Sequence, residues 1–168
     1  MALITFGLQW AWSLPIYGLF TLPDMAVDSI AIDIGIGVGS GLAVVVLWRL
    51  CAQGFAWAQQ MESEFRAVLG PLTSSEILAL AFMSAFVEEL FFRGFLQPQI
   101  GLEWAAIAFG LVHLPYRRQL IPWTLSAVAM GFAFGWMYEA RGLLLAPFLA
   151  HFVINYFNLH TIVRPRAT

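Results

Sequence analysis

Ionisable side chains interrupt three stretches of the chain that are otherwise apolar enough to lie in a bilayer. A charge at the centre of a membrane helix costs on the order of a few kcal/mol even on the mildest scales, so such residues are functional candidates by default. Acids and histidines are also common groups in general acid–base catalysis. The three stretches are Glu88-Glu89-Leu-Phe-Phe-Arg93, Phe109-Gly-Leu-Val-His113 and His151-Phe-Val-Ile-Asn155.

Spacing within these stretches decides which side chains share a helix face. Glu89 and Arg93 stand at positions i and i+4, so an ion pair between them is the cheapest way to bury both charges. Glu88 points about 100° away from Glu89 and is free to address a neighbouring helix. His151 and Asn155 are again i and i+4, and present an imidazole and an amide to one space.

Taken together, these groups predict hydrolysis of an amide bond. Glu88 would act as a general base, and His113 would share its water. His151 and Asn155 are suitable donors to the oxyanion that develops on a scissile carbonyl. Taken singly, each group also has a structural explanation, because a buried His or Asn is commonly a hydrogen-bond partner between membrane helices.

The composition is typical of an integral membrane protein. Of 168 residues, 61% are hydrophobic and 11% are charged, against about 45–50% and about 25% in soluble domains. All eight basic residues are Arg, which excludes Schiff-base or Ser-Lys chemistry with a lysine of this chain. There is no basic cluster to bind nucleic acid. The length predicts a single domain, residues 1–168.

Apolar runs of bilayer-spanning length, about 20 residues, predict an all-α, polytopic membrane bundle. We expect about six transmembrane helices plus one interfacial amphipathic helix. Glycines at alternate positions from Gly35 to Gly41 in the second run favour close helix packing, either inside the chain or in a dimer. The predicted spans are roughly residues 3–22, 29–50, 76–97, 101–114, 122–140 and 142–163.

The segment from Phe55 to Gly70 alternates apolar and polar residues at helical spacing, which predicts an amphipathic helix lying in the membrane interface. Pro71 ends it, and the capping-box sequence from Thr73 to Glu76 begins the next helix. Its expected apolar face is Ala58, Met61, Phe65, Val68 and Leu69, opposite Gln59, Gln60, Glu62, Ser63 and Arg66.

Helix threading places the polar groups at one depth. Arginines concentrate on one side of a six-helix threading, so both termini are expected in the cytoplasm. Counting 1.5 Å per residue puts Glu88 and His151 about 12–13 Å below the opposite face, and His113 and Asn155 about 18–20 Å below it. One intramembrane site is therefore expected. Asn158 and His160, nearer the last helix end, are expected to be interface residues instead.

In this order the three stretches resemble the signature of the CAAX protease and bacteriocin-processing family, also called the abortive-infection or CPBP intramembrane proteases. The signature is a Glu-Glu-xxx-Arg helix, then Phe-xxx-His, then His-xxx-Asn, and the chain matches it without substitution. The segment from Met130 to Gly142 also looks like the family's helix before the last motif. The resemblance covers about residues 74–158, the motif-bearing core.

The resemblance implies a membrane-embedded endopeptidase of the glutamic type. Glu88 with His113 would activate water, and His151 with Asn155 would stabilise the oxyanion. Members of this family were long described as metal-dependent, but the chain has no His-Glu-xx-His pair to fix two zinc ligands on one turn. We therefore expect no cofactor, with zinc as the less favoured alternative. The implied supporting residues, which hold the site together or orient the substrate, are Glu89 and Arg93.

The resemblance also implies partners and a location. The expected partners are the lipid bilayer and a membrane-associated protein or peptide, such as a C-terminal tail or a bacteriocin. Little extramembrane sequence is present to read a substrate, which disfavours prenylated CAAX proteins. We expect a multi-pass protein of the bacterial inner membrane.

Two other functions stay open. One is a non-catalytic immunity or binding protein of the same fold, although a pure binder has no use for a costly buried acid. The other is a small transporter or proton relay, for which broken helices or inverted repeats would be expected. Glu88→Gln distinguishes the three functions. It should abolish proteolysis, leave pure binding nearly intact and alter ion coupling in a transporter.

Overall fold

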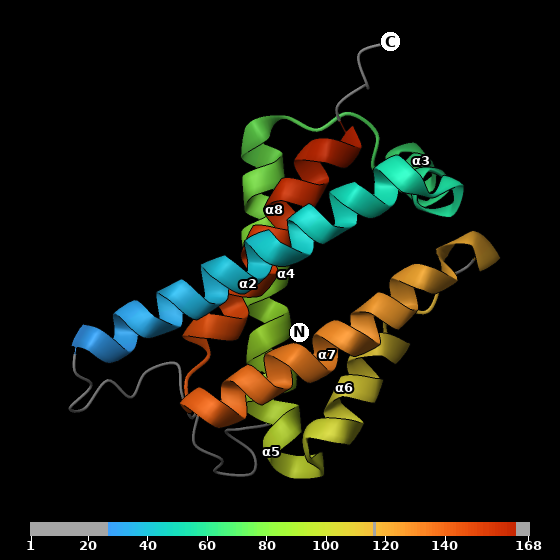
Figure 1. Ribbon diagram of the computed structural model, residues 1–168. Helices are drawn as coiled ribbons and strands as arrows, with labels where there is room; N and C mark the ends of the chain where they lie inside the picture. The colour runs from blue at the N-terminus through green and yellow to red at the C-terminus, as the bar shows by residue number, and fades with distance from the viewer. Residues whose placement is uncertain (1–26, 116, 164–168) are drawn as a thin grey trace.

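The computed structural model describes residues 27–115 and 117–163, and over these residues every regular element is a helix. Helix α8 (Leu145–Val163) is central, since it packs against α2 (Val27–Gly54), α4 (Ser74–Phe91) and α7 (Ile121–Arg141) (Figure 1). The predicted helix 3–22 lies outside the described residues. The shorter elements are α3 (Ala56–Leu69), the π-helix η1 (Phe92–Leu96), α5 (Gln97–Ile100), α6 (Leu102–Leu111) and the 3-10 turn η2 (Arg118–Leu120).

Two described segments are long and apolar enough to cross a membrane, Asp28–Gly54 in α2 and Arg118–Arg141 in η2 and α7. Their outward faces carry large exposed apolar side chains, among them Leu47, Leu125 and Trp136. Such a surface suits lipid better than water. The all-helical prediction is confirmed over the described residues, while the count of about six spans stays a prediction.

Glycines of α2 bring this helix against α8. A Cβ at Gly37 would lie 2.6 Å from the carbonyl oxygen of Ala146, and one at Gly41 would lie 2.9 Å from that of Ala150. At Gly35 and Gly39 nothing lies within 4 Å of the corresponding position. Half of the glycine pattern is therefore explained by packing inside the chain.

Gly37→Ala is expected to destabilise the protein, because the added methyl group would meet the backbone of α8, which cannot move aside cheaply. Overpacking of this kind typically costs about 1–3 kcal/mol. Gly39→Ala is the matched control, with open space at the new Cβ. Thermal unfolding of both variants in detergent measures the difference, and equal melting temperatures would contradict the packing explanation.

An ion pair with a buried acid joins the N-terminal part of α2 to the C-terminal end of α7. Asp33 is fully buried, and its Oδ1 accepts a hydrogen bond from Nε of Arg141. A second nitrogen of the same guanidinium donates to the carbonyl oxygen of Ser29. This pairing explains how an acid is accommodated within a candidate span, since a lone buried charge would be costly.

Helix α3 forms as the amphipathic pattern predicts, but two of its side chains lie on the opposite face from the one expected. Glu62 is only 3% exposed and accepts a hydrogen bond from Nε1 of Trp48, whereas Val68 is 61% exposed. The reason is that α3 packs on protein as well as facing outward. Its Arg66 donates to the carbonyl oxygen of Ile162 at the end of α8.

Helix α4 begins at the predicted capping box. The Thr73 side chain accepts a hydrogen bond from the Glu76 backbone N–H, and the Glu76 carboxylate accepts one from the Thr73 backbone N–H. At its other end α4 runs directly into η1, so that Glu88 and Glu89 lie in the last turns before a π-helical segment that contains Arg93. Isolated π-turns within helices frequently occur at functional sites.

Candidate active site

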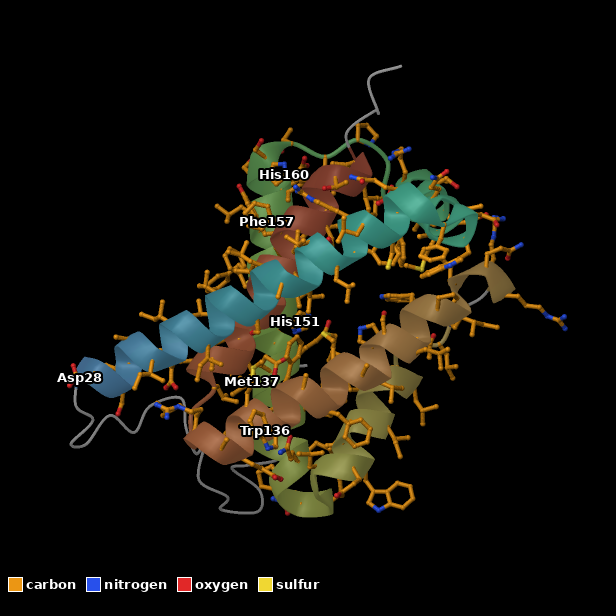
Figure 2. The ribbon with its side chains drawn as sticks, in the orientation of Figure 1. Asp28, Trp136, Met137, His151, Phe157 and His160 are labelled. Atoms are coloured by element: carbon orange, nitrogen blue, oxygen red, sulfur yellow. The ribbon has the colours of Figure 1, made fainter. Side chains whose placement is uncertain are left out.

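A cavity of about 410 Å³ lies between α2, α3, α4, α6, α7 and α8, and most of its lining is apolar. The four residues predicted to be catalytic all contribute to its wall. His151 lies on α8 near the middle of the molecule, at the level between α2 and α7 (Figure 2). The four side chains are Glu88, His113, His151 and Asn155.

His113 does not lie on a helix, contrary to the expected span 101–114. Helix α6 ends at Leu111, and His113 occupies the turn that follows. The last carbonyl groups of a helix lack helical partners, and that of Phe109 accepts a hydrogen bond from Nδ1 of His113 at 2.6 Å. The hydroxyl of Thr124 on α7 donates to the carbonyl oxygen of His113 at 2.6 Å and holds this turn in place.

The hydrogen bond between Nδ1 of His113 and the carbonyl oxygen of Phe109 determines which nitrogen of the ring can accept a proton. A carbonyl oxygen only accepts, so Nδ1 carries the hydrogen and Nε2 of the neutral ring keeps its lone pair. Nε2 lies 3.6 Å from Oε2 of Glu88. Within the described part of the chain this carboxylate oxygen is buried without a hydrogen-bond partner. When the ring is neutral and the carboxyl group ionised, two proton acceptors face each other in the cavity wall.

The predicted ion pair between Glu89 and Arg93 is present, and each residue is only 1% exposed. One guanidinium nitrogen of Arg93 donates to Oε1 of Glu89 at 3.0 Å, and another donates to the carbonyl oxygen of Gly131 at 3.1 Å. The guanidinium also lies over the ring of Phe109, 4.5 Å from its centroid. The pair thus connects α4 and η1 to α7.

His151 is held in one orientation. Its Nδ1 is 2.8 Å from Oε1 of Glu89, and its ring stacks on Phe134 with the centroids 5.3 Å apart. Because Oε1 of Glu89 is ion-paired with the Arg93 guanidinium, it accepts here and Nδ1 of His151 donates. Only Nε2 is left to act toward the cavity, and it donates there when the ring carries a second proton, whose charge Glu89 balances.

Asn155 uses its amide nitrogen to donate to the hydroxyl of Ser84 at 2.9 Å. Ser84 also lines the cavity, and the sequence reasoning missed it. The available signal was its spacing, because Ser84 precedes Glu88 by one helical turn on the same face of α4. Asn158, expected at the interface, lines the cavity instead, because it lies one turn beyond Asn155.

Close approach of α7 to α5 and α6 depends on two glycines in the segment from Met130 to Gly142, and a Cβ at Gly135 would lie 2.8 Å from Oε1 of Gln97. Gln97 donates to the carbonyl oxygen of Gly135 at 3.0 Å, one helical turn along from the bond between Arg93 and Gly131. A Cβ at Gly131 would lie 2.8 Å from the carbonyl oxygen of Ala106. These contacts account for the glycine spacing in this segment.

The ionisable groups do not fit a zinc site. Among the residues the structure describes, no three His, Cys, Asp or Glu side chains are grouped so that they would hold a metal ion. Glu89 is engaged by Arg93 and His151, which leaves Glu88 and His113 as the facing pair. Protein zinc sites use at least three side-chain ligands, and this pair supplies two.

The structure is all-helical over the described residues, has two apolar helices of membrane-spanning length, and groups ionisable side chains in the wall of one cavity. The chain belongs to the Rce1-like family, because the family model described as type II CAAX prenyl endopeptidase Rce1-like matches residues 70–157. This match confirms the CPBP resemblance. Rce1-like proteins are membrane-embedded, in agreement with the two apolar helices.

A curated relative is similar to about half of the chain. The chain is 42% identical over 81 residues to "Uncharacterized protein YpbD" of Bacillus subtilis (strain 168), a match covering 47% of this chain and 41% of that protein. The chain therefore spans less than half the length of this relative. No solved structure matches the chain.

Proposed function

We propose that the protein is an intramembrane endopeptidase that hydrolyses a peptide bond in a membrane-associated protein or peptide. The observation that carries this proposal is the presence, in the wall of one apolar cavity, of two facing proton acceptors and two amide- or imidazole-type donors. Membership of a family described as prenyl endopeptidases supports the reaction type.

Glu88 and His113 activate the water. A water molecule beside the 3.6 Å gap between Oε2 and Nε2 donates one hydrogen to each, since each contact requires only about 2.8 Å. Its lone pair then points away from both acceptors, toward the scissile carbonyl carbon. As the carbon–oxygen bond forms, the pair takes up a proton, which it returns to the leaving amine when the carbon–nitrogen bond breaks.

Asn155 and His151 stabilise the oxyanion on the same carbonyl. The amide of Asn155 has a second N–H besides the one bonded to Ser84, and His151 donates through Nε2. Glu89 and Arg93 do not line the cavity, so their role is to orient His151 and balance its charge. Fixed donors in a water-poor site are effective because they need no reorganisation during the reaction.

The apolar lining favours an extended apolar segment as substrate, such as a membrane-anchored tail or a hydrophobic peptide. Peptide carbonyl groups within a helix are engaged by hydrogen bonds, so the segment must be unwound where it is cut. We place the reaction in a multi-pass, metal-free protease of the glutamic type in a bacterial inner membrane. Residues 1–168 form its single domain, with the core at residues 74–158.

The test compares polypeptide termini by mass spectrometry in membranes from cells that carry the wild-type chain or Glu88→Gln at matched expression. A new terminus found only with the wild type identifies both substrate and bond, and supports proteolysis that depends on Glu88. Identical sets of termini, in cells shown to synthesise membrane-anchored tails and hydrophobic peptides, would instead favour the immunity or binding function.

A further inference from the structure

We propose that Ser84 is a positioning residue that sets the orientation of the Asn155 amide toward the oxyanion. This inference rests on the proposed function and adds to it a residue outside the three sequence motifs. The geometry that carries it is the hydrogen bond of 2.9 Å between Nδ2 of Asn155 and Oγ of Ser84, which joins α8 to α4 at the wall of the cavity.

An asparagine amide has two chemically opposite ends, and only one is useful here. With the nitrogen toward the substrate, Asn155 donates to the oxyanion. With the ends exchanged, its carbonyl oxygen would face a developing negative charge and repel it. Oxyanion stabilisation therefore depends on which end the surrounding residues select.

Ser84 selects the productive end. Its hydroxyl donates to the carbonyl oxygen of Ala81, one turn back on α4, at 3.3 Å. The hydroxyl hydrogen is thus committed to the helix, and the oxygen lone pairs are left to accept. An acceptor at this position binds the NH₂ end of Asn155 and disfavours the carbonyl end. One N–H of the amide is held by Ser84, and the other remains for the substrate.

Ser84 also fixes the spacing between the water-activating group and the oxyanion donor. It lies one helical turn before Glu88 on α4, a rise of about 6 Å, and both side chains line the same cavity. Glu88, which accepts from the nucleophilic water, therefore lies on the same rigid helix as Ser84, which orients the oxyanion donor. Their separation is set by the helix and does not depend on how α4 and α8 pack elsewhere.

The experiment measures how fast the Glu88-dependent polypeptide terminus appears in cell membranes after a pulse of expression. Ser84→Ala should slow it on the order of 10-fold, less than the 10²–10³-fold that removal of an oxyanion donor costs. Ser84→Thr keeps the hydroxyl and should retain a rate near that of the wild type, whereas Ser84→Val, which matches threonine in shape but has no hydroxyl, should not. Ser63→Ala, on the outside of α3, is the control for the substitution itself.

A double-mutant comparison separates positioning from a general effect on structure. In an Asn155→Ala background, Ser84→Ala should cause no further loss, because the residue it orients is gone. A further 10-fold loss there, or a wild-type rate for Ser84→Ala alone, would overturn the proposal while leaving the endopeptidase intact. Absence of any Glu88-dependent terminus in the wild type would overturn both.

Discussion

Glu88→Gln is expected to lower the rate of peptide-bond hydrolysis by about 10²- to 10⁴-fold, the usual contribution of a positioned general base. The amide has nearly the shape of the carboxylate but cannot accept a proton at neutral pH. The loss follows from the geometry, because Nε2 of His113 and Oε2 of Glu88 lie 3.6 Å apart as facing acceptors. Removing one leaves a water with a single acceptor and a less defined orientation.

The variant should lose activity without losing its fold, since the Glu88 side chain makes no hydrogen bond through Oε2 in the described structure and is 23% exposed. The measurement pairs the cleavage rate with thermal unfolding in detergent. Glu103→Gln is the matched control, an exposed acid in the first turn of α6. Undiminished cleavage by Glu88→Gln would remove Glu88 from the mechanism, and a large drop in melting temperature would assign it a structural role.

Arg93→Met is expected to destabilise the protein by about 3–5 kcal/mol, the typical cost of leaving a buried charge without its partner. Met has comparable length and packs well in irregular apolar space, so lost volume is not the main effect. Glu89 would remain as a buried carboxylate, and among the described residues its ion-pair contacts would be reduced to the one with His151. The carbonyl oxygen of Gly131 would also lose the hydrogen bond that connects α7 to η1.

A charge-neutral double variant distinguishes charge from packing. Glu89→Gln combined with Arg93→Met removes both charges together and should unfold at a higher temperature than Arg93→Met alone. Arg118→Met controls for the substitution at an exposed position. If the double variant were the less stable one, the arginine would act mainly through packing, and the ion pair would not explain its burial.

These two predictions distinguish the residue proposed to react, Glu88, from the residues proposed to support the site, Glu89 and Arg93. Glu88 lines the cavity, whereas Glu89, its neighbour in sequence, is buried behind the wall. A helix places adjacent residues about 100° apart, so in the proposed mechanism one pair of glutamates supplies both a reactive group and an orienting group. The family motif is therefore explained by helix geometry together with the cost of burying charge.

Much of the site could be predicted because it depends on local spacing. The i, i+4 ion pair of Glu89 and Arg93 and the capping box at Thr73 follow from helix geometry alone, and both are present. Positions that depend on contacts between distant segments were not predictable in the same way. Glu62 is buried because Trp48 and the cavity lie beside it, and the periodicity of α3 contains no information about either.

The turn that carries His113 shows the same limit. An apolar run predicted a helix through Leu114, but the helix ends at Leu111, and the ring caps the free carbonyl of Phe109. Apolar composition does not distinguish the end of a helix from its continuation when a side chain can satisfy the last carbonyl groups. Thr124, from the following helix, then holds the turn.

Composition, short motifs and short-range periodicity were enough to predict the helical class, the apolar surface, the residue types of the site and the family. The contact of Ser84 with Asn155, that of Glu89 with His151, and the choice of glycines that face a neighbouring helix became visible in the folded chain alone. Those contacts join residues far apart in sequence, and their existence depends on how helices cross and rotate. Helix crossing is set by the sum of many packing contacts, none of which is encoded at a single position.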